Sequence, residues 1–205
     1  MDFKLNVYTN LNAPFNLNDS IRIAFSHPIV KAGMDKFILY EDSATRINYN
    51  TRFTDSINRK IFIAAAWKEN KSYVLEIPAG SFTDTFGLKN DTLRINFQTR
   101  QLKEYGSLKI NLKVSETKYP LILQLMDEKE NVFRQSVFQS DTTLNYEYLL
   151  PLGYRLKIIV DENGNGKWDT GNYLQHLQPE KVFYNPATIN VRANWDIETD
   201  WMIAP

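Results

Sequence analysis

The chain has 205 residues, enough for one large domain or for two domains of about 100 residues that each bury their own core. Its 24 basic and 24 acidic residues balance, and no basic block stands out, so nucleic acid is not an expected partner. Cysteine is absent, which excludes disulfide bonds and thiolate metal sites. No apolar run is long enough for a membrane-spanning helix, so we expect no membrane span.

Short alternating segments separated by turn residues make up the first half of the chain. Apolar and polar residues alternate in most of these segments, and none keeps the 3.6-residue period of a helix. Pro and Gly break the pattern between them. This half is therefore expected to be a β-sandwich. Its predicted strands are 21–25, 37–40, 60–66, 73–77 and 93–97.

Four motifs punctuate these strands: Phe25-Ser26-His27-Pro28-Ile29, Tyr73-Val74-Leu75, Asp84-Thr85-Phe86-Gly87 and Ile95-Asn96-Phe97-Gln98-Thr99. Together they resemble the bacterial Ig-like domain found in S-layer and other surface proteins. The resemblance implies an Ig-like β-sandwich over residues 1–102. Its motifs are structural, so it indicates a fold and says little about function.

A polar stretch that ends in Gly, residues 100–106, predicts a linker, and we place the domain boundary after residue 102. The second domain is then 103–205, and its elements are again expected to be strands. Alternating apolar residues predict these strands over 108–114, 121–125, 144–148 and 154–160, with a charged hairpin turn at 127–131.

Further motifs lie in this second half. They are G-S-L-K-I-N-L-K-V from Gly106, L-L-P-L-G-Y from Leu149, Gln178-Pro179-Glu180, and Asn194-Trp195-Asp196-Ile197-Glu198. They are similar to transthyretin-like modules, the type also seen in carboxypeptidase regulatory domains, although Leu152 is an added residue in the second motif. The resemblance implies a transthyretin-like β-sandwich, a module that commonly follows the Ig-like one in bacterial surface lipoproteins.

The turn that follows Val160 is the best chemical candidate. Oxygen-bearing side chains alternate along it, and Gly166 stands at its sixth position, as in the first part of a calcium loop. Position 12 holds Asn172 in place of the expected Glu. The candidate ligands are Asp161, Asn163, Asn165, Lys167 (through its carbonyl oxygen) and Asp169.

Two interpretations of this turn stay open. In the first it binds calcium weakly, with water or Glu180 supplying the missing ligands, because only two of the candidate ligands in the loop are carboxylates. In the second it is a metal-free turn in which Asn and Asp side chains cap their own backbone. The sequence does not decide between them.

Catalytic residues are not expected. His27 and His176 are the two histidines, and no G-x-S-x-G motif accompanies them. We expect His27 to be a turn residue and His176 a solvated loop residue. The chain is therefore predicted not to be an enzyme.

Aromatic residues crowd the end of the chain. They could form a platform for sugar rings or for a partner protein, or they could pack on the core of the second domain. Because aliphatic residues flank them, we expect packing. The residues are Trp168, Tyr173, Phe183, Tyr184, Trp195 and Trp201.

These expectations combine into a non-catalytic module of a bacterial cell-surface or periplasm-facing envelope protein, with a spacer or adhesion role. The alternatives are a carbohydrate-binding module and an accessory domain of a larger secreted enzyme. A lipid anchor and other domains are expected in a missing N-terminal region. The expected partner is a surface protein or a glycan.

Overall fold

The computed structural model describes residues 3–42, 44–115 and 117–204, and the chain divides into two compact units, Met1–Gln101 and Leu102–Pro205. Both units are built from strands, so the predicted all-β fold with two tandem sandwiches is confirmed. None of the helices in the described residues has the length and apolar character of a membrane span. These helices are three short 3-10 turns: η1 (Met34–Lys36), η2 (Leu102–Glu104) and η3 (Tyr173–Gln175).

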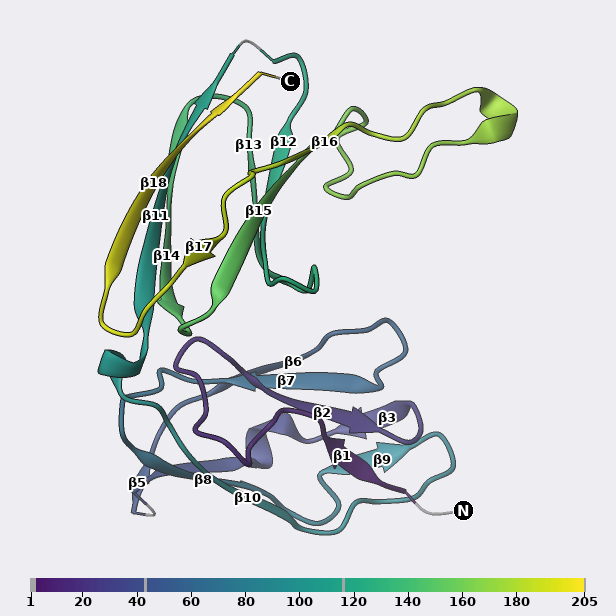
Figure 1. Cartoon of the computed structure of the whole chain (residues 1–205). Coiled ribbons are helices and arrows are strands. Elements are labelled where there is room, and N and C mark those ends of the chain that lie inside the picture. The colour runs from purple at the N-terminus through teal and green to yellow at the C-terminus, as the bar shows by residue number, and fades with distance from the viewer. Residues whose placement is uncertain (1–2, 43, 116, 205) are drawn as a thin grey trace. The chain divides into compact units, whose positions relative to one another are not determined.

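Unit 1 contains two four-stranded antiparallel sheets and one strand pair (Figure 1). The first sheet has the order β1 (Leu5–Val7), β2 (Ile21–Phe25), β7 (Lys60–Ala64), β6 (Asn50–Phe53). The second has the order β10 (Leu93–Gln98), β8 (Ser72–Ile77), β4 (Ile38–Glu41), β5 (Thr45–Arg46). The pair is β3 (Ile29–Ala32) with β9 (Phe82–Asp84).

The core of unit 1 follows from the alternation in its strands. In β2, Ile21, Ile23 and Phe25 are buried while Arg22 between them is exposed. Apolar side chains on one face of each sheet meet in one cluster, since burying them removes apolar area from water. Its members include Phe15, Phe37, Leu39, Ile61, Ile63, Trp67, Tyr73, Leu75, Phe82 and Phe97.

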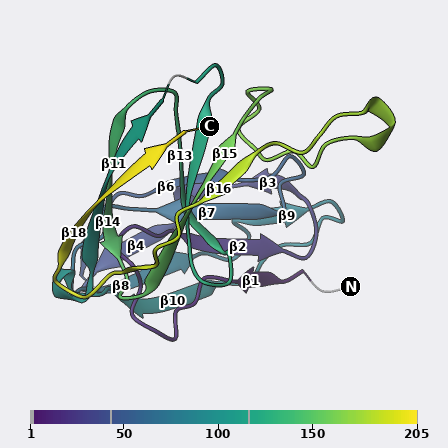
Figure 2. The same ribbon diagram turned by 45° about the horizontal axis from the view of Figure 1, so that its top comes forward.

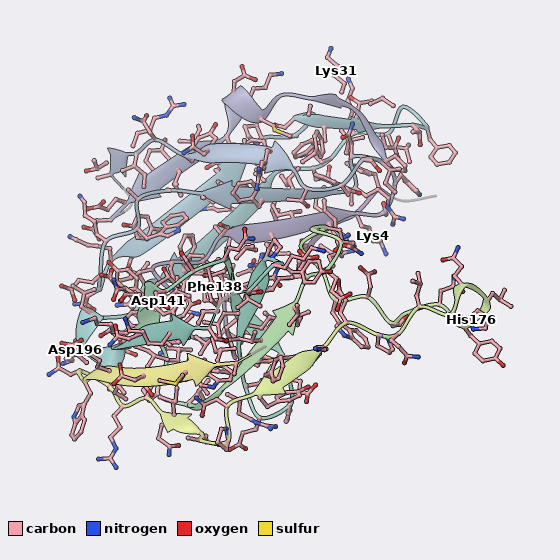
Figure 3. All side chains as sticks on the ribbon, turned by 90° about the horizontal axis from the view of Figure 1, so that it is seen from above. Lys4, Lys31, Phe138, Asp141, His176 and Asp196 are labelled. Carbon is pink, nitrogen blue, oxygen red and sulfur yellow. The ribbon has the colours of Figure 1, made fainter. Side chains whose placement is uncertain are left out.

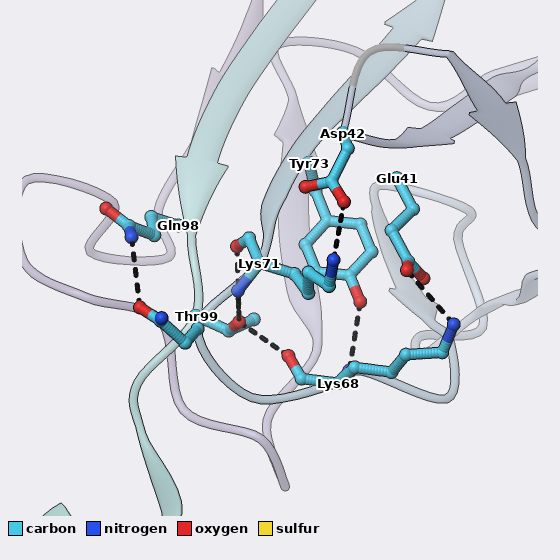
Figure 4. Close-up of polar contacts among 8 residues, drawn as sticks. Glu41, Asp42, Lys68, Lys71, Tyr73, Gln98 and Thr99 are labelled. Atoms are coloured by element: carbon cyan, nitrogen blue, oxygen red, sulfur yellow. Dashed lines mark hydrogen bonds and ion pairs between the residues drawn. The ribbon is translucent and has the colours of Figure 1, made fainter.

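Polar contacts fix the turn between β7 and β8 (Figure 4). The buried Thr99 hydroxyl donates to the Lys68 carbonyl oxygen at 2.6 Å and accepts from the Lys71 amide at 3.0 Å. The Tyr73 hydroxyl accepts from the Lys68 amide at 2.9 Å. Lys68 Nζ in turn lies 3.0 Å from Oε1 of the buried Glu41, whereas Glu41 Oε2 is buried without a hydrogen-bond partner among the described residues.

Unit 2 is built from two further sheets. The three-stranded sheet has the order β14 (Thr142–Leu149), β11 (Gly106–Val114), β18 (Asp196–Ile203). The other has the order β13 (Val132–Phe138), β12 (Leu121–Met126), β15 (Gly153–Val160), β16 (Val182–Tyr184), and β17 (Ile189–Asn190) also pairs with β15. Figures 1 and 2 both place β18 beside β11, and this pair is parallel whereas the other pairs of unit 2 are antiparallel.

The core of unit 2 lies between these sheets. Leu121, Leu123 and Leu125 of β12 are fully buried, as the alternation predicts. The predicted hairpin turn at 127–131 is also confirmed, because the Asp127 carboxylate accepts the amides of Lys129 and Asn131, each at 2.8 Å. The remaining core residues include Leu108, Ile110, Leu112, Tyr146, Tyr154, Leu156, Ile158, Val160 and Ile203.

Strand β18 is not among the strands predicted from the sequence, where residues 194–198 appear only as part of a C-terminal motif. Its outward positions carry Asp196, Glu198 and Asp200, and acidic residues are depleted in strands. The inward positions, among them Trp201 and Ile203, pack on the core. Because all eight residues of β18 pair with residues 107–114 of β11, the tertiary contacts outweigh the weak local preference.

Candidate functional site

The loop that follows β15 folds back over the outer face of the β13-β12-β15-β16 sheet. Gln135 of β13 donates from Nε2 to the Gly166 carbonyl oxygen at 3.1 Å. Lys157 of β15 places Nζ 5.8 Å from the ring centre of Trp168, within the range of a cation–π contact. On this same face Ile122 and Ile159 oppose each other in register and are fully buried. The loop is thus anchored to a sheet.

Asp161 is the centre of the loop. It is 1% exposed, and both of its carboxylate oxygens accept backbone amides. Oδ1 accepts from Asn165 at 3.0 Å and Oδ2 accepts from Gly166 at 2.8 Å. Asp161 directly follows β15, and its bonds to amides four and five residues later close a tight turn. Gly166 supplies the positive φ of 76° that this turn requires.

The other predicted ligands gather around Asp169. Its Oδ2 accepts from the side-chain amides of Asn163 at 2.7 Å and Asn165 at 2.6 Å. The amide oxygens of these two residues accept the backbone amides of Asn165 and Lys167, at 3.0 and 2.8 Å. The structure therefore brings the five predicted residues into one loop, and the side chains cap their own backbone as in the metal-free interpretation.

Glu180 also belongs to this loop. Its side chain is largely buried, and its carboxylate accepts the amides of Glu162 at 2.9 Å and Asp169 at 3.0 Å. The Trp168 indole donates to the Glu180 carbonyl oxygen at 3.1 Å. The carboxylate thus joins both ends of the 161–169 segment. In the sequence, the Gln178-Pro179-Glu180 motif is the feature that points to Glu180.

The charges of the loop are unbalanced. Asp161, Asp169 and Glu180 all lie in it, and in the part of the chain that the structure describes none of them lies within 4.0 Å of a basic side chain. Backbone and side-chain amides stabilise these charges in place of a counter-ion. Grouped carboxylates are also typical of calcium sites. Within residues 3–42, 44–115 and 117–204, however, no three His, Cys, Asp or Glu side chains are close enough to hold a metal ion by themselves.

A hairpin projects from the loop between Asp169 and Glu180 (Figure 3). Asn172 and Leu177 exchange two backbone hydrogen bonds of 3.0 Å, and the Asn172 side chain caps the amides of Leu174 and Gln175. His176 lies at the exposed tip, where a solvated loop residue is predicted. The tip is therefore shaped by its own hydrogen bonds.

A Ser–His–Asp set occurs in unit 1, within the motifs of the Ig-like resemblance. His27 Nδ1 lies 2.8 Å from Oδ2 of the fully buried Asp84 and 3.4 Å from Ser26 Oγ. Both contacts fall on the same ring nitrogen, whereas a catalytic triad needs the serine on Nε2 and the acid on Nδ1. The set instead joins the strand end after β2 to the turn after β9.

The aromatic residues near the C-terminus correct one expectation. Phe183 and Trp201 pack against the core, as predicted. The packing prediction is wrong for the other four, because they lie in loops or on outward-facing strand positions. They are Trp168, Tyr173, Tyr184 and Trp195, which are 43%, 91%, 42% and 55% exposed.

Residues 8–99 match the bacterial Ig-like domain family. The match includes β2 to β10 and confirms the Ig-like resemblance for this part of the chain. It ends before unit 2 begins. No curated protein matches the chain significantly.

Several solved structures are similar at low identity. An alpha-2-macroglobulin from Escherichia coli is 9% identical with a TM-score of 0.40, over 87% of this chain and 70% of that chain. The major pilin subunit of Bacillus cereus is 10% identical with a TM-score of 0.32, over 98% and 70%. A bacterial adhesin from Mobiluncus mulieris is 13% identical with a TM-score of 0.27, over 99% and 97%. TM-scores this low carry no argument, so the family relation rests on the bacterial Ig-like match of residues 8–99.

Proposed function

We propose that the chain is a non-catalytic structural or adhesion module of a bacterial cell-surface protein. The observation that carries the proposal is the bacterial Ig-like match of residues 8–99. The all-β architecture of both units supports it, since sandwich domains in tandem along a chain suit a spacer between a cell and its surroundings. A fold alone does not determine function, so the proposal needs a test in the cell.

The motif residues of unit 1 support a structural role. His27, expected to be a turn residue, contacts Asp84, and this carboxylate also accepts the amides of Phe86 at 2.9 Å and Leu88 at 2.8 Å. These contacts hold a turn in place. His27 and Asp84 therefore have a structural role that involves no reaction with a substrate.

For unit 2 the proposal is finer. We assign it to the transthyretin-like modules, on the motif resemblance of residues 103–205 and on its two-sheet architecture. The proposal includes a lipid anchor and further domains upstream in the full-length protein, and a surface protein or glycan as partner.

Surface display is the part that one experiment tests directly. Antibodies raised against this chain are applied to intact cells of the source bacterium and to permeabilised cells, with a cytosolic protein as the control. We expect labelling of the intact cells. Labelling that requires permeabilisation would contradict the proposal.

We also propose that the 161–180 loop binds calcium weakly. The observation that favours this is the group of three carboxylates, Asp161, Asp169 and Glu180, without a basic partner within 4.0 Å in the described residues. Calcium prefers oxygen ligands, and carboxylate, amide and carbonyl oxygens are what this loop offers. Because these oxygens already accept hydrogen bonds, calcium has to compete with them, and a low affinity is expected.

A further inference from the structure

Unit 2 contains a cavity at the end of its three-stranded sheet where β11 begins. Its volume is about 370 Å³, within the range of small-ligand sites. It differs from the calcium loop in sheet and in residues. The lining side chains on which the inference depends are Tyr105, Asn145, Glu147, Tyr148, Asn194 and Trp195.

Aromatic side chains form one part of the cavity wall. Trp195 is 55% exposed and Tyr148 is 37% exposed, so both present ring surface to solvent. Tyr105, which is buried, meets the Tyr148 ring edge-on at 5.6 Å between centroids and supports it from behind. The guanidinium of Arg192 lies 5.0 Å from the Trp195 ring centre and holds that ring by a cation–π contact.

Polar side chains that have no hydrogen-bond partner among the described residues form the other part of the cavity wall. The side chains of Asn145, Glu147 and Asn194 make no hydrogen bond or ion pair within the described residues. The same sheet face looks different farther along β11. There the Asn111 amide donates to Glu198 at 2.8 Å and to Asp200 at 2.9 Å. Free hydrogen-bonding groups are therefore concentrated beside the cavity.

The backbone around the cavity is unusual in two places. Tyr148 has φ of 56° within strand β14, and Asn194 has φ of 59° in the loop before β18. Positive φ is rare for an aromatic residue and is found where surrounding structure enforces it, often at binding sites. Nearby, the pairing of β11 with β14 shifts register between Gly106 and Leu108, and such bulges re-aim side chains.

Gly106 keeps the wall in place. A Cβ atom at this residue would lie 2.7 Å from Val191 Cγ1 and 2.9 Å from the Trp195 carbonyl oxygen. The loop that carries Trp195 therefore packs directly on the backbone of β11. The aromatic and polar groups are thus held by the fold and need little ordering when a ligand binds.

We propose that this cavity binds a neutral saccharide. The aromatic rings offer flat apolar surface to the C–H face of a sugar, and the Asn and Glu side chains offer donors and acceptors to its hydroxyl groups. The charges of the lining side chains disfavour an anionic ligand, because Glu147 and Asp196 are acidic and the lining ammonium of Lys109 already lies 2.9 Å from Glu198. This inference does not depend on calcium binding or on surface display.

The test uses the whole chain and soluble hexasaccharides of glucose, xylose, mannose, galactose and N-acetylglucosamine. Each is titrated to about 10 mM while the indole N–H signals of the four Trp residues are followed by NMR. We expect at least one hexasaccharide to bind with a dissociation constant near or below the millimolar range, and to shift the Trp195 signal.

Substitutions test whether the saccharide binds in this cavity. Trp195→Ala and Asn145→Ala are expected to weaken binding about tenfold or more, whereas Trp168→Ala, outside the cavity, leaves it unchanged. A cooperative thermal transition well above the temperature of the titration shows that each variant is folded. The inference is wrong if no hexasaccharide binds, or if the binding survives both cavity variants.

Discussion

At the residue scale, the buried carboxylates of unit 1 show how polar groups hold the fold. Burial alone would raise the pKa of Asp84, but hydrogen bonds from Leu88, His27 and Phe86 outweigh it, and the pKa lies below its ordinary value of 3.8. Such a group stabilises the folded state above its unfolded pKa, and the contribution disappears as the pH falls through the folded pKa. Asp84, a residue of the Ig-like motifs, is therefore expected to make the stability of unit 1 fall at acidic pH.

Asp84→Asn tests this role. The variant is expected to lower the melting temperature of unit 1 by several degrees at pH 7, because an amide cannot accept all three hydrogen bonds as a carboxylate does. The fall in melting temperature between about pH 5 and pH 2 should also be less steep than in the wild type. Asp35→Asn, at an exposed position of η1, is the matched control and should change neither quantity. A pH profile of Asp84→Asn parallel to that of the wild type would contradict the assignment.

Two neighbouring lysines give a second test at this scale. Lys68 pairs with Glu41, which is 7% exposed, whereas Lys71 pairs with the exposed Asp42 at 2.6 Å. Lys68→Ala leaves a buried carboxylate without its cation and is expected to cost about 1 kcal/mol in the free energy of unfolding, a value reduced because Lys68 is itself solvated. Lys71→Ala should cost less, since exposed pairs contribute little. Urea denaturation of both variants measures the difference, and equal costs would show that burial of Glu41 is unimportant.

At the element scale, strands with apolar residues on one face could be predicted from the sequence. Alternation identified β2, β8, β10, β11 and β12 because each carries apolar residues of the core at every second position. The short edge strands β5 and β17 and the acid-rich β18 could not be predicted, because their pairing depends on partners far along the chain. Tertiary contacts decide such elements.

Of the two candidate sites, one could be predicted from the sequence and the other could not. The residues of the 161–169 loop are close in sequence, so their spacing predicted that they gather. The saccharide cavity joins residues near 105, 147 and 195, and only the pairing of β11 with β14 and β18 brings these together. The exposure of Trp195 depends on this topology, which explains why flanking aliphatic residues misled the packing prediction.

The calcium proposal is tested on this loop. We expect 10 mM calcium to raise the melting temperature of unit 2 by a few degrees over EDTA, in line with a dissociation constant of about 10⁻⁴ to 10⁻³ M. Asp161→Ala should abolish the calcium-dependent shift, whereas Lys167→Ala should keep it, because position 7 offers only its carbonyl oxygen. Identical melting temperatures in calcium and EDTA for the wild type would mean that the loop is a metal-free turn.

Strand β11 offers a further test of an element. Gly106→Ala places a methyl group against Val191 and the Trp195 carbonyl oxygen, and overpacking of this kind costs about 1–3 kcal/mol. Gly153→Ala is the control, because its Cβ would meet only the Thr188 methyl group at 3.1 Å and side-chain atoms beyond it. Chemical denaturation should show a clear loss for the first variant and a small one for the second. Equal effects would contradict the close packing of β11 on the 191–195 loop.

At the scale of the whole molecule, the chain consists of two units with separate cores. The apolar cluster of unit 1 and that of unit 2 share no residue, and the division falls between Gln101 and Leu102. A unit with its own core is expected to fold by itself. The account of this protein as a structural module of tandem sandwiches depends on that independence.

Calorimetry of the whole chain and of the separate segments 1–101 and 102–205 tests this claim most directly. We predict a cooperative transition for each segment, and a profile of the whole chain that contains both transitions. Segments without cooperative transitions, beside a whole chain that unfolds in a single one, would contradict the account.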